Sequence, residues 1–155
     1  MRQVIQRYDQ PGKWEVKIPF TKVREDKSWV GVVDARRPGE YELLVVGVHK
    51  AEATKGRIAV RVVAGAGARV KIRGVVKIAK NAQDTDSFLE LRALTLDKTA
   101  VVMLDPELEI EANQVKASHA ASVGPIDTEQ LLYMQSRGLT KEQAERTIVA
   151  GWLGV

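Results

Sequence analysis

The sequence predicts a mainly β body followed by a short pair of helices. Apolar and charged residues alternate in KWEVKI (13–18) and in part of RIAVRV (57–62), with the two-residue period of a half-buried strand. The denser apolar runs SWVGVV and ELLVVGV are separated by ARRPGEY, in which Pro38-Gly39 marks a turn. Two helix-start patterns occur near the C-terminal end. We therefore expect a β body over residues 1–124 and a helical segment over residues 125–155.

The middle of the chain predicts many short strands with no helices between them. Apolar pairs such as Leu89/Leu91 and Leu108/Ile110 recur every several residues, and Gly65, Gly67 and Gly74 are expected to break AGAGARVKIRGVVKIAKNA into short β pieces. RVVAGAGA (61–68) resembles VKIAKNAQ (76–83), because a β pair leads into a corner of small residues in both. Such corners are typical of a β-solenoid, whose chain must bend repeatedly without bulky side chains in the way. The pattern alone leaves a sandwich, a barrel and a solenoid open.

The C-terminal segment carries two helix starts. Asp127 precedes Gln130 by three residues, and Thr140 precedes Gln143 by three, which is the spacing of a capping box. The first helix would place Leu131, Leu132 and Met134 on its apolar face and stop at Gly138, and the second would use Ala144, Ile148 and Trp152. The two together predict a helical hairpin.

Composition excludes several classes of protein. The 155 residues fit one domain, and the absence of cysteine removes disulfides, cysteine zinc sites and a thiol nucleophile, and favours a cytoplasmic location. No apolar run approaches the roughly 20 residues that span a bilayer, so we expect no membrane partner. No glycine-rich GxxxxGK[ST] motif occurs, so we expect no ATP binding by a P-loop.

Charge is distributed in two blocks of opposite sign. Eight basic and no acidic residues lie between Lys55 and Lys80, and eight acidic residues lie between Asp84 and Glu111. The blocks are predicted to pair across neighbouring strands or to face a partner. No aromatic side chain is interleaved with the basic block, so we expect no nucleic-acid partner.

Few residues offer catalytic or metal-binding chemistry. His119 lies in VKASHAASVG, where it is either a core histidine or a ligand free of steric competition. Three alternate glutamates in ELEIE would share one strand face, as a solvated strip, a partner for the basic block, or oxygen ligands for a metal ion. We expect a structural or surface role for His49. Asp84 and Asp86 leave open a carbohydrate-cleaving enzyme.

Three segments together resemble the C-terminal region of the SufB/SufD family, the scaffold components of SUF iron–sulfur cluster assembly. They are NAQDTDSF (81–88), LDPELEIEANQVKASHAASVG (104–124) and IDTEQLLYMQSRGLTKEQA (126–144). The resemblance implies a right-handed parallel β-helix with C-terminal helices, and a non-catalytic role as a short SufD-like scaffold or accessory protein. It implies pairing through the β-helix, as a homodimer or with a SufB/SufD-type partner, and docking of a SufC-like ABC ATPase.

Individual residues follow from the same resemblance. The family's histidine falls on His119, which implies a ligand for iron or for a transiently held iron–sulfur cluster. The segment that contacts the ATPase falls on residues 127–152, where we expect Leu131, Tyr133 and Trp152 to bind the partner. Ala117 replaces the cysteine that SufD-type members commonly carry two positions before the histidine. A second hypothesis is therefore a protein-interaction module of the same fold that has lost metal chemistry.

Overall fold

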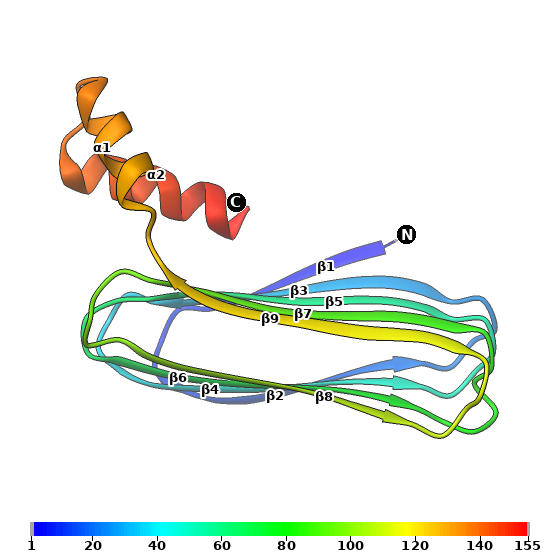
Figure 1. The fold of residues 1–155 in the computed structure, drawn as a ribbon. Helices are drawn as coiled ribbons and strands as arrows, with labels where there is room; N and C mark the ends of the chain where they lie inside the picture. Colours follow the sequence, from blue (N-terminus) through cyan, green and yellow to red (C-terminus); the bar gives the residue numbers. More distant parts are fainter. Residues whose placement is uncertain (1, 155) are drawn as a thin grey trace.

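The computed structural model describes residues 2–154, which form nine β-strands and then two helices (Figure 1). The strands are β1 (Arg2–Tyr8), β2 (Gly12–Phe20), β3 (Asp26–Ala35), β4 (Gly39–His49), β5 (Lys55–Ala64), β6 (Ala68–Ile78), β7 (Thr85–Thr95), β8 (Val101–Ile110) and β9 (Val115–Pro125). The helices are α1 (Thr128–Ser136) and α2 (Lys141–Leu153).

The strands build a parallel β-solenoid of about four turns. Odd-numbered strands form one sheet in the order β1-β3-β5-β7-β9, and even-numbered strands form the other in the order β2-β4-β6-β8. Every pairing is parallel, so the chain passes from one wall to the other and advances by one coil each time it returns. The predicted solenoid is confirmed, and the sandwich and the closed barrel are wrong.

The expectation of many short strands is also wrong, because each wall of a coil is one strand of 9–11 residues from β2 to β9. Gly74, where a break was expected, lies within β6. Leu89, Leu91 and Leu94 all lie on β7. Leu89 and Leu91 belong to the interior core, whereas Leu94 belongs to a separate cluster beneath α2. Apolar residues on both sides of one strand hide its alternation, which is why the sequence pattern resembled separate short strands.

The small-residue corners are confirmed. The corner between β5 and β6 contains Gly65 and Gly67, and Gly67 has a φ of +73°, which favours glycine. A Cβ at Gly65 would lie 2.7 Å from the carbonyl oxygen of Arg36 in the preceding coil. Glycine therefore allows successive corners to stack closely.

The solenoid interior is filled mainly by aliphatic side chains stacked in register. Ile58 is paired with Trp29 on one side and with Leu89 on the other, and all three side chains are buried. A smaller cluster lies outside the five-stranded sheet, where Val149 and Leu153 of α2 pack with Val30, Val32, Val63 and Leu94. The first cluster holds the coils together, and the second attaches the helical pair.

The helical hairpin is confirmed, with two corrections to its apolar faces. Asp127 caps α1 by accepting from the backbone N–H groups of Glu129 and Gln130, and Thr140 caps α2 in a complete capping box with Gln143. Leu132, expected in the apolar face, is 59% exposed. In α2 the buried residues are Ala144, Val149 and Leu153, because the face that meets the sheet is rotated from the predicted one. No helix within residues 2–154 combines the length and apolar character needed to cross a membrane.

Candidate functional site

The site that contains His119 is the last coil of the solenoid, formed by β8 and β9. β9 pairs with β7, from Thr85↔Val115 to Thr95↔Pro125, and is the last strand of its sheet. β8 likewise ends the other sheet. Because both are terminal strands, each has one backbone edge that is not paired within its sheet. Such edges can accept a strand from another chain.

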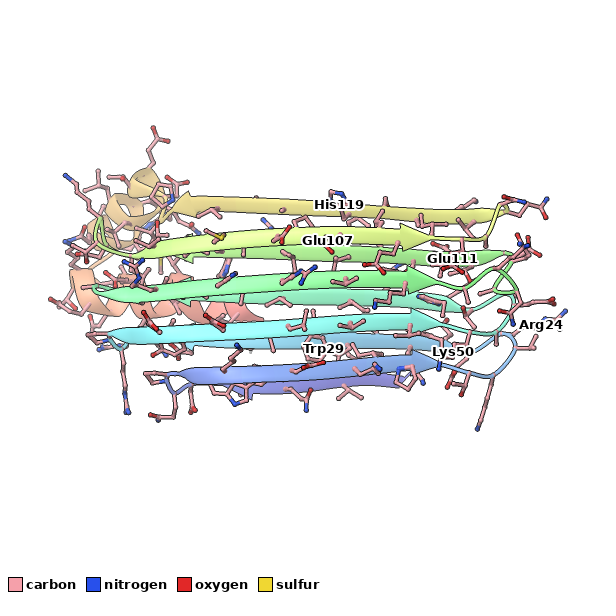
Figure 2. All side chains as sticks on the ribbon, turned by 90° about the horizontal axis from the view of Figure 1, so that it is seen from below. Arg24, Trp29, Lys50, Glu107, Glu111 and His119 are labelled. Carbon is pink, nitrogen blue, oxygen red and sulfur yellow. The ribbon has the colours of Figure 1, made fainter. Side chains whose placement is uncertain are left out.

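His119 faces the interior side of β9 but is exposed. It is in register with Leu89, which is fully buried inside the coil below. Partners in a parallel pair point to the same side of a sheet, so the imidazole projects over the open end of the stack. No further coil covers it, and the side chain is exposed to solvent. Figure 2 shows His119 on this outermost strand.

The interior-facing side chains of the last coil, other than His119, are mainly apolar. We define the open end face as the interior-facing residues of the last coil. The β8 side chains that pack against the core include Val102, Leu104 and Leu108, and Ile110 continues their row at 41% exposure. On β9, small Ala117 and Ala121 flank His119, and Val123 is 50% exposed. The open end face is therefore an uncovered continuation of the core.

Two of the three glutamates of ELEIE, Glu107 and Glu109, lie on β8 and point away from the side that His119 faces, and Glu111 lies just beyond the end of that strand. Leu108 is in register with buried Val76, so Glu107 and Glu109 point to the outer side of β8, opposite to the side that His119 faces. There, a carboxylate oxygen of Glu107 lies 2.9 Å from Nη2 of Arg73, and one of Glu109 lies 3.7 Å from Nζ of Lys77. The predicted pairing of the basic and acidic blocks across neighbouring strands is confirmed here.

The donor set of one chain does not fit an iron–sulfur cluster. Such clusters are held mainly by cysteine thiolates, and the sequence contains no cysteine. Within the described part of the chain, no three histidine, aspartate or glutamate side chains gather at a spacing that could hold a metal ion. His119 offers a single imidazole, with methyl groups at the neighbouring interior-facing positions.

Of the two histidines, His49 is the one buried in the core with both ring nitrogens in hydrogen bonds. Its Nδ1 lies 2.7 Å from Oγ1 of Thr54, and its Nε2 lies 3.1 Å from Oγ of Ser87. The ring stacks on Phe20, with a centroid separation of 4.1 Å. Burial lowers the pKa of His49 from 6.5 to about 4, so the imidazole is neutral at pH 7. The expected structural role of His49 is confirmed.

The carboxylates considered for carbohydrate cleavage are not arranged as an acid and a base. Asp86 forms an ion pair with Arg57 at 3.1 Å, and hydrogen bonding to that guanidinium lowers the pKa of Asp86. A general acid needs a raised pKa. Asp84 lies in the turn before β7 with a φ of 59°. The geometry gives no support to a glycosidase.

The three residues predicted to bind a partner occupy different environments in the helical pair. Tyr133 on α1 is 59% exposed, as is its neighbour Leu132, whereas Leu131 is buried. Trp152 on α2 packs on the outside of the five-stranded sheet, and the guanidinium carbon of Arg92 lies 4.6 Å from its ring centroid. The fold therefore leaves two large apolar side chains of α1, Leu132 and Tyr133, exposed to solvent.

Comparison with known proteins gives a family match over most of the chain. A family model described as "SUF system FeS cluster assembly, SufBD core domain" matches residues 30–152. The iron–sulfur cluster assembly protein SufD of Bacillus subtilis (strain 168) is 38% identical over 106 residues, which cover 68% of this chain and 24% of the relative.

Two further relatives agree. SufD of Escherichia coli (strain K12) is 40% identical over 81 residues, covering 52% of this chain and 19% of the relative. A SufBD family iron–sulfur cluster assembly protein of Staphylococcus aureus (strain USA300) is 32% identical over 106 residues, covering 68% of this chain and 23% of the relative. The aligned region thus spans about a quarter or less of each relative's length.

Proposed function

The chain belongs to the SufBD family of the SUF iron–sulfur cluster assembly system, and from this membership we propose that it is a non-catalytic scaffold or accessory protein of that assembly, located in the cytoplasm. The observation that carries the proposal is the family match from β3 to α2, which includes both the open end face and the helical pair. Two interactions follow, one at each of these features.

The first interaction is pairing through the open end face. The apolar side chains of this face and the unpaired backbone edges of β8 and β9 would be covered if the open end face of a second solenoid stacked on them. Backbone hydrogen bonds would continue both sheets, and the core would become continuous across the two chains. The partner is a second copy of this chain or a SufB/SufD-type protein.

Charge favours one arrangement of a symmetric pair. β8 ends and β9 begins at the same end of the coil, so Glu109 and Lys116 lie towards the same corner. If β8 of each copy pairs with β9 of the other copy, Lys116 of one copy lies near Glu109 of the other, and the two opposite charges attract. If each β8 instead meets the other β8 with full antiparallel overlap, the middle of the strand meets itself and brings two Asp105 side chains together. Like charges placed opposite each other are destabilising, so the crossed arrangement is preferred.

Cysteine cross-linking tests this pairing, because the sequence has no cysteine of its own. Chains carrying Glu109→Cys are mixed with chains carrying Lys116→Cys and treated with a short bis-maleimide. The crossed arrangement predicts a covalent dimer in the mixture, in excess of either variant alone. Self-linking of Asp105→Cys would show that like strands meet instead. A monomer at micromolar concentration by analytical ultracentrifugation would contradict pairing of two copies.

The second interaction is docking of a SufC-like ABC ATPase on the helical pair. Exposed Tyr133 and Leu132 supply adjacent apolar contacts on α1, and aromatic side chains contribute much of the binding energy of many interfaces. Leu131 and Trp152 support docking by packing within the hairpin and on the sheet. In this proposal Tyr133 contacts the ATPase directly, whereas Leu131 and Trp152 hold the helical pair in place.

Binding to an immobilised SUF-type ATPase tests the docking. Tyr133→Ser is expected to weaken binding at least tenfold while leaving thermal unfolding unchanged, since its side chain is exposed. Leu131→Ala and Trp152→Ala should weaken binding and also lower the unfolding temperature. Glu129→Gln, also exposed on α1, is the matched control. Wild-type binding by Tyr133→Ser would contradict the docking surface.

Iron or an iron–sulfur cluster would be the cargo of this scaffold. We propose that His119 supplies one nitrogen ligand and that the paired chain supplies the others, because one chain offers no complete donor set. Anaerobic incubation with ferrous iron and sulfide, together with a full-length SufB/SufD-type partner, tests this role. His119→Ala should reduce iron retained by the complex, with exposed Ser118→Ala as the control.

The alternative function is a protein-interaction module that has lost metal chemistry. The absence of cysteine favours it, as does the lack of a three-residue donor group within residues 2–154. Equal and negligible iron in the wild-type and His119→Ala complexes, with pairing intact, would decide for this alternative.

A further inference from the structure

The C-terminal turn of α2 contacts two arginine side chains of the solenoid. Val149 and Leu153 pack on the outer surface of the five-stranded sheet, against residues of β3, β5 and β7. Beside this apolar contact, Arg61 on β5 and Arg92 on β7 occupy directly paired positions in the register. Both side chains reach α2, although Arg61 lies 92 residues before Leu153 in the sequence and Arg92 lies 60 residues before Trp152.

Each arginine contacts a different part of the same helical turn. Nη1 of Arg61 donates a hydrogen bond to the carbonyl oxygen of Leu153 at 3.2 Å. The guanidinium of Arg92 lies over the indole of Trp152, with 4.6 Å between its carbon and the ring centroid. A guanidinium within about 6 Å of a tryptophan face is in the range of a cation–π interaction.

The contacts offset an electrostatic cost in the sheet. Two like charges at paired positions of neighbouring strands repel each other. The C-terminal end of a helix carries a partial negative charge, and α2 has no basic residue in its own last turn. Arg61 supplies that missing positive charge from the sheet, and the electron-rich face of Trp152 accommodates Arg92.

Gly154 makes room for this arrangement. It caps α2 with a φ of 71°, a conformation that favours glycine. A Cβ at this position would clash with the guanidinium of Arg61. The backbone at the end of α2 is therefore shaped both for helix termination and for close approach of the arginine.

We propose that Arg61 and Arg92 form a clamp that fixes the direction in which the helical pair projects from the solenoid. α1 rises away from the sheet and α2 returns towards it (Figure 1), so the seat of α2 determines where α1 stands. Trp152 is thus an anchor within the chain, and Arg61 and Arg92 are positioning residues for Tyr133. Only this last consequence rests on the proposed ATPase docking; the clamp itself does not.

Hydrogen exchange of the full chain tests the clamp directly. Arg61→Gln and Arg92→Gln are each expected to speed exchange of the α2 amides about fivefold, and the double variant more, without changing the strand amides. Arg92→Lys keeps a cation over the indole and should restore protection. Arg57→Gln removes an outward arginine of β5 that pairs with Asp86, and should leave α2 unchanged. Wild-type exchange of α2 in the Arg61/Arg92 double variant would overturn the clamp.

ATPase binding separates the clamp from the docking proposal. If Tyr133→Ser binds the ATPase normally, the docking surface is wrong, and the exchange experiment still decides the clamp. If Tyr133→Ser abolishes binding, the double arginine variant should weaken it by a smaller factor, because its Tyr133 remains available on a less fixed hairpin. Unchanged binding by a double variant with a loosened α2 would overturn the positioning role.

Discussion

The two histidines of this chain lie on the inner side of the same solenoid but in opposite environments. His49, at the end of β4, is fully buried, with Phe20 of the preceding coil against its ring and Ser87 of a following coil on its Nε2. His119, near the middle of β9, has Leu89 below it and no coil above it. An inward direction therefore does not by itself make a residue part of the core.

The difference lies in the neighbouring coils. The groups around His49 come from two other strands on different coils, Phe20 on β2 and Ser87 on β7, and from Thr54 in the turn after β4. His119 lacks the coil that would complete such an enclosure. A terminal coil thus turns a core position into an accessible one, which is the condition for contact with a partner or a ligand.

Removing the His49 side chain should have the largest effect on stability. His49→Ala leaves a cavity beside Phe20 and removes the partner of two buried hydroxyl groups, so we expect a loss of about 4 kcal/mol in the free energy of unfolding. Urea denaturation followed by circular dichroism measures it. A loss below about 1 kcal/mol, the size typical of an average substitution, would show that the enclosure contributes little.

Acidification should have the next largest effect on stability, through His49. Burial lowers the pKa of His49 from 6.5 to about 4, whereas in the unfolded chain the imidazole has its ordinary pKa. The unfolded state therefore binds the proton first, and stability falls as the pH drops from 6.5 towards 4. The shift corresponds to about 3 kcal/mol, present in full above pH 6.5.

Denaturation at several pH values checks this dependence. Carboxylates also titrate in the lower part of the range, so the informative quantity is the difference between the wild type and His49→Gln, which has no imidazole at this position. The wild type should lose about 3 kcal/mol more than the variant. Parallel curves would mean that His49 becomes protonated without disturbing the fold.

Removing one hydrogen-bond partner of His49 should have an intermediate effect. Thr54→Val keeps the shape of the side chain but leaves Nδ1 without the hydroxyl that lies 2.7 Å away. We expect a loss of about 1–2 kcal/mol, typical of a buried polar group left unpaired. Thermal unfolding measures it, with exposed Ser118→Ala as the control. An unchanged unfolding temperature would contradict the importance of this hydrogen bond.

His119→Ala should change the stability of the unpaired chain least. Its side chain is exposed, and substitutions at such positions usually alter stability by less than about 0.5 kcal/mol. The measurement is urea denaturation at a protein concentration low enough to keep the chain monomeric. A loss comparable to that of His49→Ala would show that His119 belongs to the core, and the distinction between the two histidines would be lost.

Local structural features could be predicted from the sequence. The alternation in KWEVKI predicted a strand that forms β2, Gly65 and Gly67 predicted a corner, and Asp127 and Thr140 predicted both helix starts. Each of these features depends on residues within a few positions of one another. The resemblance of residues 81–144 to the SufB/SufD family added the solenoid, which the periodicity had left open beside a sandwich and a barrel.

Other features depended on contacts between distant segments. The two-sided burial of β7 concealed a continuous strand, because α2 covers Leu94 from outside. Trp152 was expected to bind a partner, and the fold places it beneath Arg92. His119 lies in bland surroundings in the sequence, and its exposure arises because β9 is the last strand of its sheet.

The sequence by itself determined which segments become strands, corners and capped helices, because those choices rest on side-chain patterning and backbone preference over a few residues. Only the tertiary structure decided which inward-facing residues are covered and where the helical pair is seated. Both depend on the register between coils some thirty residues apart, and on whether another coil follows.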